Sequence, residues 1–377
     1  MEARIAGQTG LYEFDSVLKI YGNSILKAFL SLKANHLNVV KIVAFNLGAL
    51  AAYHYVRNRR TLTVVTFHRV LPLSELERYE ADPIYTVTPR LFEEIVKFLK
   101  KYYCIVHLDD VIASRRHIKR LPRRALLITF DDGWYDNYEY ALPILKKHGV
   151  SATLFAASDA IREARTTWWQ EVVGWALRTG RGDDAILRRL EELGQRNDCL
   201  DPTLRLLVDY GELDPSTRDN KLARLTQEME TLSNRRQMLD IVTLQALARQ
   251  GFAIGLHGAA HLPLTFLSEP GRDLYRALSS IKAYLDVDRI ASLSFPHGRY
   301  DERVITAARQ LGLDLLFSSD AVINVCPGGY IPTDILGRIP IYQGFIQENE
   351  NELSDRRICQ WMFLRSRARL KFDHGRQ

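Results

Sequence analysis

Short apolar runs alternate with helix-like segments along the chain from residue 61 onward. Each run ends at polar side chains, and several helix-like segments are followed by glycine, where a helix is expected to stop. The apolar runs cover 61–67, 126–130, 151–157, 252–256 and 291–295, and the helix-like segments include 89–101, 139–148, 243–250 and 301–311. This alternation predicts a parallel sheet that is covered by helices.

Polar residues of unusual chemistry recur at the carboxyl end of one predicted strand after another. The residues at these positions are His68, Asp131, Asp132, His257 and His297. In an α/β barrel, the carboxyl ends of the strands form the face that carries the active site. We therefore predict an α/β fold, a distorted (β/α) barrel whose reactive residues meet at one end.

The alternation is interrupted between about residues 162 and 240, where helical periodicity with many Arg and Glu residues replaces it. We interpret this segment as a helical insertion between two barrel strands. The predicted organisation is an N-terminal helical extension over 1–60, a barrel over 61–345 that includes the insertion, and a charged, peripheral tail over 346–377.

The composition is that of an ordinary globular protein, with 46% hydrophobic and 25% charged residues among 377. Basic residues exceed acidic ones, 51 to 45, and cluster at 57–60, 115–124 and 365–371. These clusters indicate either solvated surface or attraction to anionic headgroups or acidic glycans. Nucleic-acid binding is not expected, because no recognition motif accompanies the charge. The four cysteines form no CxxC pair, which disfavours disulfides and structural zinc, and Cys104 is expected to be buried.

The start of the chain does not resemble a secretory signal, because residues 1–10 are polar. The apolar segment 39–56 is interrupted by Lys41, Asn46 and His54, and basic residues follow it. Three alternatives fit this segment: a helix packed on the domain, a helix on a membrane surface, and a membrane span. The expected compartment is the cytoplasm, with peripheral membrane contact through this region as a further expectation.

Two adjacent carboxylates, Asp131 and Asp132, follow the strand predicted at 126–130. Like charges repel, so a fold that keeps such a pair at a strand end usually offsets the repulsion with a cation. Because neighbouring side chains point in different directions, one carboxylate can bind a metal while the other holds a water molecule. The alternative is an Asp pair that caps the next helix.

Two imidazoles, His257 and His261, follow the strand predicted at 252–256, and their spacing of four allows them to share one metal ion. With one carboxylate they make three protein ligands, which leaves a position open for water, as in catalytic sites. Such an ion acidifies water and polarises a carbonyl group, and the spare carboxylate can take the proton.

A third motif, Ser-Phe-Pro-His-Gly-Arg-Tyr at 294–300, follows the strand predicted at 291–295. Pro296 and Gly298 fix a sharp turn there, and a backbone N–H group in such a turn can face a developing oxyanion. A plain strand-to-helix turn is the alternative. Trp168 and Trp169 open the insertion and belong either to its core or to a platform on which a sugar ring stacks.

In their order along the chain, three motifs resemble the signature of the polysaccharide deacetylases, the NodB-homology enzymes of carbohydrate esterase family 4. The motifs are Thr-Phe-Asp-Asp-Gly at 129–133, His-Gly-Ala-Ala-His at 257–261 and Phe-Pro-His-Gly at 295–298. Phe-His-Arg-Val-Leu-Pro at 67–72 also resembles the start of many members. The similarity covers roughly residues 61–342 without the insertion.

This resemblance implies a NodB-type barrel and one divalent metal ion, commonly zinc. Asp132, His257 and His261 would be its ligands, Asp131 the general base, and the backbone N–H of His297 part of the oxyanion site. Two features depart from the family pattern. Ser294 stands where an Arg often orients the base, and the late segment Leu-Gly-Arg-Ile-Pro-Ile at 336–341 lacks the His that often acts as general acid. His68 and His297 are candidates for that role, with His68 preferred.

These observations predict a metal-dependent hydrolase that removes an N-acyl group, with acetyl the expected one, from an amino sugar in a polysaccharide or other glycan. One alternative is a deacylase of a lipid-linked or small glycan precursor, which the absence of an export signal favours. Another is a relative that binds glycans without cleaving them, because it has lost the acid and the orienting Arg.

Overall fold

The structure is a computed structural model that describes residues 41, 43, 45–163, 167–182, 184–196, 201–232, 235–349 and 352–368. It divides into two compact units, Met1–Ala52 and Tyr53–Gln377. Most of the predicted N-terminal extension, with the polar segment 1–10, lies outside the described residues. The barrel, the insertion and the described part of the tail all belong to the second unit.

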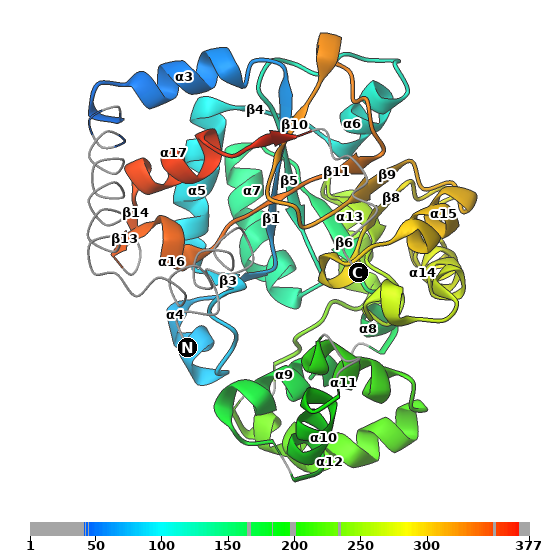
Figure 1. Cartoon of the computed structure of the whole chain (residues 1–377). Helices are drawn as coiled ribbons and strands as arrows, with labels where there is room; N and C mark the ends of the chain where they lie inside the picture. Colours follow the sequence, from blue (N-terminus) through cyan, green and yellow to red (C-terminus); the bar gives the residue numbers. More distant parts are fainter. Residues whose placement is uncertain are drawn as a thin grey trace, which may run out of the picture. The chain divides into compact units, whose positions relative to one another are not determined.

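Eight short parallel strands form a nearly closed barrel (Figure 1) in the order β12, β1, β5, β6, β7, β8, β9 and β11. Every residue of β1 and β5 is buried, so both faces of the sheet are covered there, as their continuous apolar sequences predict. The prediction of a distorted (β/α) barrel is confirmed. The strands are β1 (Thr61–Phe67), β5 (Ala125–Phe130), β6 (Thr153–Ala156), β7 (Ala253–Leu256), β8 (Ser292–Ser294), β9 (Leu315–Phe317), β11 (Ile335–Leu336) and β12 (Ile339–Pro340).

The barrel closes where the chain passes from β11 to β12 through Gly337 and Arg338. Because β11 pairs with β9 and β12 pairs with β1, these two residues span the seam between the edges of the sheet. A Cβ atom on Gly337 would lie 2.4 Å from Cγ2 of Val322 and 2.5 Å from the carbonyl oxygen of Asp320. The side chain of Asn324 bonds both the N–H and the carbonyl of Gly337. The seam therefore has room for glycine only.

Shorter strands extend the sheet beyond the barrel. The strand β4 (Cys104–Ile105) pairs with β5, and β10 (Ile323–Val325) runs antiparallel to β1. Two small separate sheets are formed by β2 (Arg69–Val70) with β3 (Thr86–Val87), and by β13 (Gln347–Asn349) with β14 (Glu352–Leu353). Cys104 is exposed, so the expectation of a buried thiol is wrong; the two-residue strand β4 has no buried residue.

Helices pack around the barrel, and their ends follow local sequence signals. Thr88 caps α5 by accepting a hydrogen bond from the N–H of Leu91, and α7 stops at Gly149, which has a left-handed backbone. The helices outside the insertion are α3 (Ala49–Arg57), α4 (Leu73–Arg78), α5 (Pro89–Tyr102), α6 (Leu108–Arg115), α7 (Leu142–His148), α8 (Ser158–Glu163), α13 (Ile241–Arg249), α14 (Pro270–Leu285), α15 (Glu302–Gln310), α16 (Gln343–Ile346) and α17 (Asp355–Phe363).

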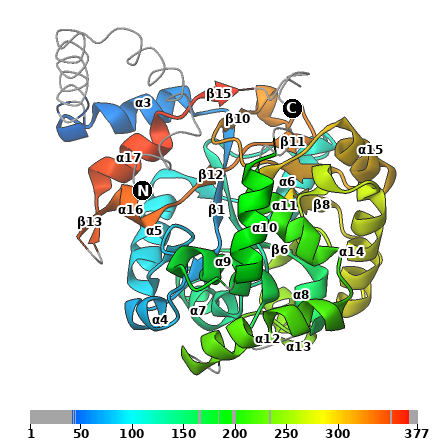
Figure 2. The ribbon, with the colours of Figure 1, turned by 60° about the horizontal axis from the view of Figure 1, so that its bottom comes forward.

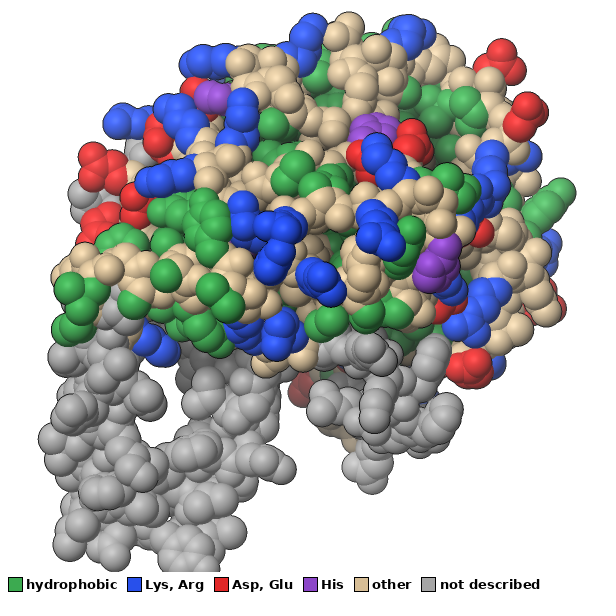
Figure 3. All heavy atoms as spheres, turned by 90° about the horizontal axis from the view of Figure 1, so that it is seen from above, with side chains coloured by type: hydrophobic (Ala, Val, Ile, Leu, Met, Phe, Trp, Pro, Cys, Tyr) green, Lys and Arg blue, Asp and Glu red, His purple; other side chains and the backbone are tan. Residues whose placement is uncertain are grey.

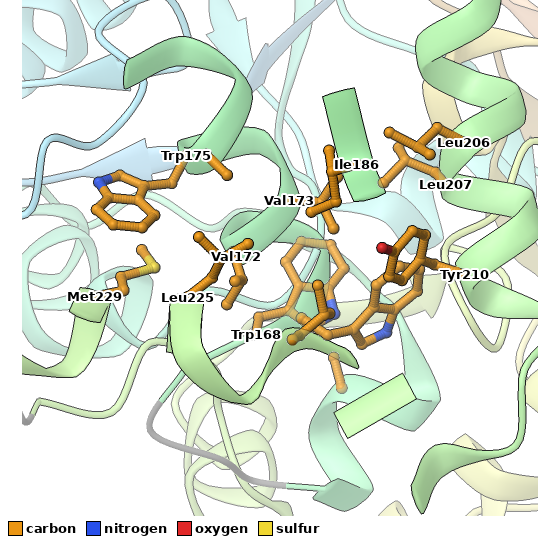
Figure 4. Packing of buried hydrophobic residues seen from close by; sticks show 14 of the residues in the cluster. Trp168, Val172, Val173, Trp175, Ile186, Leu206, Leu207, Tyr210, Leu225 and Met229 are labelled. Carbon is orange, nitrogen blue, oxygen red and sulfur yellow. The ribbon is translucent and has the colours of Figure 1, made fainter. Parts of the chain in front are cut away.

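The predicted insertion is a group of four helices between β6 and β7, at the end of the barrel where the strands finish (Figures 1 and 2). These helices enclose a hydrophobic cluster of their own (Figure 4), in which Trp175 and Leu206 are fully buried. Trp134 and Leu262, which follow β5 and β7, belong to the same cluster and so join the insertion to the barrel. The helices are α9 (Trp169–Thr179), α10 (Asp184–Gly194), α11 (Pro202–Gly211) and α12 (Pro215–Leu232).

The described part of the C-terminal tail is integrated into the domain. The helix α17 buries Ile358, Cys359, Met362 and Phe363. The strand β15 (Arg367–Ala368) adds to the sheet by pairing with β10. The charge of the tail predicted a peripheral segment. Residues 352–368 instead pack on the domain, because apolar side chains lie between the charged ones.

The segment predicted at 39–56 ends in α3, and at His54 this helix is packed rather than solvated. The His54 ring stacks on Phe363 with 4.1 Å between ring centres, and its Nε2 lies 3.3 Å from the carbonyl oxygen of Tyr102. The side chain of Asn58 donates to its Nδ1 over 3.0 Å. Within the described residues, no helix has both the length and the apolar character that crossing a membrane requires.

Candidate metal centre and active site

Asp132, His257 and His261 converge at the carboxyl end of the barrel, although more than 120 positions separate Asp132 from the imidazoles in the sequence. Asp132 follows β5, and both imidazoles lie in the segment after β7. The Asp132 Oδ1 atom is 3.3 Å from His257 Nε2 and 3.2 Å from His261 Nε2. All three side chains are buried, and their ligand atoms lie within 4.8 Å of one another. The three residues therefore lie together in the structure, as the sequence predicts.

Hydrogen bonds on the far side of each imidazole fix its protonation. His257 Nδ1 lies 2.8 Å from the backbone carbonyl oxygen of Ser294, so this nitrogen carries the hydrogen. His261 Nδ1 lies 2.8 Å from Oε1 of Gln170. The amide nitrogen of Gln170 bonds two backbone carbonyls, so Oε1 must be the atom that faces His261. In their neutral form, both imidazoles therefore turn an unprotonated Nε2 toward Asp132.

The three facing atoms are all acceptors, and this arrangement fits a cation. Trp134 Nε1 donates to Asp132 Oδ2 over 2.8 Å, whereas the buried Asp132 Oδ1 has no hydrogen-bond donor. A buried acceptor without a partner is costly, and a metal ion at this point would satisfy it together with both imidazole nitrogens. Two imidazole nitrogens and one carboxylate oxygen are a donor set that suits zinc.

The charges of the cluster are coupled. Burial raises the pKa of the Asp132 carboxyl, but the His261 and His257 imidazoles outweigh burial and hold it well below its usual range. Burial lowers the pKa of His257, but the Asp131 and Asp132 carboxylates outweigh burial and raise it. For His261 burial dominates, and the pKa is lowered. The cluster thus keeps the Asp132 carboxylate ionised and favours the neutral form of the His261 imidazole.

Asp131 is held apart from this cluster by Arg338, which the sequence prediction did not assign. The guanidinium donates to both carboxylate oxygens, over 2.7 and 2.8 Å, and both side chains are buried. Burial raises the pKa of Asp131, but Arg338 and then His257 outweigh burial and lower it. Ser294 makes a longer contact of 3.4 Å with the same carboxylate. Arg338, from the barrel seam, thus contacts Asp131 more closely than Ser294 does.

His68 and Tyr85 lie together at the same end of the barrel. His68 follows β1, whose last residue pairs with the last residue of β5, so the imidazole stands next to Asp131 in the sheet. It is half-buried, and its ring centre is 4.8 Å from that of Tyr85. Tyr85 is 47% exposed and offers an aromatic face that the sequence prediction did not single out.

The turn formed by Pro296, His297 and Gly298 packs against the loop of the two imidazoles. The His297 ring is partly buried, with its centre 4.5 Å from that of the His261 ring, and its Nε2 lies 3.1 Å from the His261 carbonyl oxygen. Burial and the adjacent His261 hold the pKa of His297 well below its usual range. A Cβ atom at Gly298 would approach Oγ of Ser319 to 2.4 Å, so the turn requires glycine there.

The backbone at this end of the barrel is strained at three of the predicted site residues. Asp132, His261 and His297 have positive φ angles of 77°, 54° and 55°. Such angles cost free energy in residues other than glycine and persist where the surrounding structure enforces them. Strained residues of this kind cluster at active sites and ligand-binding sites, so their presence together here supports a functional role for this end of the barrel.

Trp168 and Trp169 do not offer a surface for a sugar. They are 7% and 8% exposed and lie in the hydrophobic cluster of the insertion, in which Figure 4 labels Trp168. Trp168 packs its edge against Trp134, and the Arg218 guanidinium covers Trp169 at 4.8 Å. The structure therefore supports the core alternative over the platform, because both rings are buried in the cluster.

A barrel that gathers one Asp and two His beside a second, Arg-bound Asp has the arrangement of a deacetylase of the NodB type. The family model described as "Polysaccharide deacetylase" matches residues 118–196 and 225–316, which contain all three motifs. The matched part of the chain belongs to the polysaccharide deacetylase family. YxkH of Bacillus subtilis (strain 168), which is named as a polysaccharide deacetylase without an established activity, is 49% identical over 43 residues. This match spans 11% of the chain and about 15% of the length of YxkH.

Solved structures of other proteins share the fold. The Streptococcus pyogenes deacetylase PplD, solved in complex with acetate, is 16% identical with a TM-score of 0.52, and the match covers 81% of this chain and 99% of PplD. IcaB from Ammonifex degensii is also 16% identical, with a TM-score of 0.50 and coverage of 81% and 97%. At this identity the likeness establishes the NodB-type barrel and no finer property.

Proposed function

We propose that the chain is a metal-dependent hydrolase that removes an N-acyl group, acetyl in the simplest case, from an amino sugar of a glycan. The observation that carries this proposal is the set of three buried acceptor atoms on Asp132, His257 and His261, next to the separate carboxylate of Asp131. One group of residues is suited to hold an ion, and the other is suited to move a proton.

The residues divide the work of amide hydrolysis. Asp132, His257 and His261 would hold one divalent ion, with zinc as the best match, and a bound ion would acidify water and polarise the amide carbonyl. Asp131 accepts the proton of the attacking water, since its lowered pKa keeps it ionised at neutral pH. Arg338 fixes the orientation of this carboxylate through two hydrogen bonds.

The leaving amine needs a proton, and His68 is the better donor of the two candidates. His68 is half-buried at the carboxyl end of β1, where it can reach a substrate. The His297 ring already donates to a backbone carbonyl, and its low pKa keeps it neutral. For His297 we propose only the backbone role, in which its N–H faces the developing oxyanion in the turn from Pro296 to Gly298.

Zinc-supplemented deacylation of a panel of N-acetylated glycans and glycan precursors tests the proposal. We expect acetate release that a chelator stops and that Asp131→Asn reduces by about 100- to 10,000-fold, since it removes the general base. Metal content, measured by elemental analysis, should survive in Asp131→Asn. Full activity of this variant would refute the role of Asp131. Wild-type protein that releases no acyl group and binds no metal would refute the function.

We also propose that the opposite end of the barrel contacts an anionic membrane. Seven arginines, here called the basic rim, gather where β1 and β5 begin. The segments that carry them are joined by backbone bonds such as Arg124 N–H to the Arg59 carbonyl. Figure 3 shows basic side chains grouped on this face. The basic rim consists of Arg57, Arg59, Arg60, Arg120, Arg123, Arg124 and Arg367.

Charge and apolar exposure together favour a lipid surface for the basic rim. Within the described part of the chain, no ion pair of these seven arginines with a carboxylate is found. Val56 and Ile118 are 79% and 74% exposed beside them, and Tyr53 and Tyr55 are also exposed. Arginines attract anionic headgroups, and exposed apolar and aromatic side chains can enter the boundary between headgroups and acyl chains. Phosphates of a nucleic acid would leave these apolar groups unused.

A further inference from the structure

We propose that the helical insertion is an integral part of the metal centre, and that Gln170 on α9 is the positioning residue through which it acts. This inference rests on the proposed function, because it concerns the same ion. It goes beyond that function by assigning a role to a segment that interrupts the barrel and contributes none of the three ligands.

Three hydrogen bonds tie Gln170 to the loop of His261. Its amide nitrogen donates to the carbonyls of Ala260 and His261 over 2.8 and 3.1 Å, and its Oε1 accepts from His261 Nδ1 over 2.8 Å. The Gln170 side chain is 7% exposed, so no solvent competes for these bonds. One side chain thus holds both the ring and the backbone of a candidate metal ligand, at a residue whose φ of 54° is strained.

The two imidazoles are supported by different parts of the molecule. His257 donates to the backbone carbonyl of Ser294, at the end of a barrel strand, which any residue at that position would supply. His261 donates to a side chain that belongs to the insertion. A metal-bound imidazole needs such a partner on its other nitrogen, because this bond fixes its tautomer and its orientation. The site is therefore complete only when α9 is in place.

The insertion has the rigidity that this role demands. The helix α9 begins at Trp169, one position before Gln170, and packs on α12 through the hydrophobic cluster. Trp168 packs against both Trp134 and His261, with ring centres 5.4 and 5.3 Å apart. Trp134 in turn donates to Asp132. Two of the three candidate ligands are thus braced by residues of this cluster.

Gln170→Leu tests the proposal, because leucine has a similar size and removes all three bonds. Zinc affinity is measured by competition with a chromophoric chelator on folded, metal-free protein. We expect affinity to fall by about 10- to 100-fold, the usual cost of losing the partner of a ligating imidazole. Gln245→Leu is the matched control, because Gln245 also donates to a backbone carbonyl, that of Tyr284, but far from the site. It should bind zinc within about twofold of wild type.

A second control separates positioning from general weakening of the insertion. Leu206 is fully buried in the insertion cluster, so Leu206→Ala should lower the melting temperature and leave zinc affinity nearly unchanged while the protein is folded. Equal losses of affinity in Leu206→Ala and Gln170→Leu would overturn the proposal, and so would unchanged affinity in Gln170→Leu.

Nitrogen NMR of wild-type protein gives a test that needs no folded variant. With labelled histidine and no metal, His261 should be present as the tautomer that carries its hydrogen on Nδ1. The opposite tautomer would overturn the proposal even if Gln170→Leu does not fold. Wild-type protein that fails to bind zinc would instead refute the proposed function, so the two failures are distinguishable.

Discussion

At the scale of single residues, the chemistry depends on how Asp131 is kept apart from Asp132. The two carboxylates are neighbours in the sequence, yet one faces two imidazoles and the other faces Arg338. Opposite environments give them different roles, as in other sites where paired acids work together. The sequence predicted the pair and its division of roles by resemblance. It did not predict Arg338, which lies 207 positions from Asp131 and reaches it only through closure of the barrel.

We predict that Arg338→Lys moves the acidic limb of the pH–rate profile to higher pH. Lysine keeps the charge but loses the bidentate contact, so the pKa of Asp131 should rise from its lowered value. Since Asp131 works as a carboxylate, activity should then be lost at a higher pH as the solution is acidified. The value of kcat/KM at its optimum should fall by about 10- to 100-fold. Ser294→Ala is the control, because its contact with Asp131 is long, and it should move the limb less. An unmoved limb in Arg338→Lys would contradict the assignment.

At the scale of elements, the sequence predicted what depends on local pattern. Alternating apolar runs marked five of the eight barrel strands, and glycines such as Gly149 marked helix ends. The short strands β9, β11 and β12 were not predicted. The contacts between distant elements were not predictable in this way. Gln170 looks like any polar residue of an amphipathic helix until α9 is placed on the loop of His261. Likewise, Trp168 and Trp169 could face a ligand or a core, and only packing of the insertion decided between them.

Gly337 gives a prediction at this scale, because it allows the chain to cross the barrel seam. Gly337→Ala should destabilise the protein by about 1–3 kcal/mol in urea unfolding, since its Cβ would overlap Val322 and the Asp320 carbonyl. It should also reduce activity by moving Arg338, its neighbour. Gly344→Ala in α16 is a matched control, because a Cβ there meets no atom within 4 Å. Similar stabilities of the two variants would contradict this prediction, because they would mean that the seam accommodates the added Cβ atom.

At the scale of the whole molecule, the tail and the end of α3 meet around His54. The buried ring accepts from Asn58, stacks on Phe363 and lies against the Tyr102 carbonyl, contacts that suit a neutral imidazole. Burial, the largest effect, lowers the pKa of His54 to about 4. The expected cytoplasmic location stays a prediction from the sequence, since these packing contacts say nothing about it.

We predict that His54 makes the free energy of unfolding depend on pH. The unfolded imidazole binds a proton near pH 6.5 and the folded one near pH 4, so the unfolded state holds more protons between these values. Stability is then complete above pH 6.5 and decreases as the pH falls toward 4, by about 2 kcal/mol at pH 5. Urea unfolding at pH 7.5 and 5 measures this loss. In His54→Gln the loss should be smaller by that amount, and an identical loss in both proteins would refute the assignment.

The basic rim makes a second prediction at this scale. The triple variant Arg59→Gln, Arg60→Gln and Arg123→Gln should bind vesicles with phosphatidylserine more weakly by on the order of 100-fold, at about 1 kcal/mol for each arginine. Neutral phosphatidylcholine vesicles should bind neither protein well. Cosedimentation at low and high salt gives the measurement. The control replaces three exposed basic residues of the insertion, Arg188, Lys221 and Arg224, by Gln. Binding of wild type to an acidic polysaccharide but not to these vesicles would contradict a lipid partner.

The direction of β1 has a consequence for which sugars the enzyme can reach. This seven-residue strand starts beside Arg60 and ends beside His68, a separation of roughly 20 Å. If the protein binds a bilayer through the basic rim, the candidate active site at the other end of the barrel therefore faces away from the lipid. Monosaccharides attached directly to a carrier in that same leaflet would lie on the wrong side. Glycan chains that extend well beyond the headgroups, or that diffuse freely, could reach the carboxyl end of the barrel.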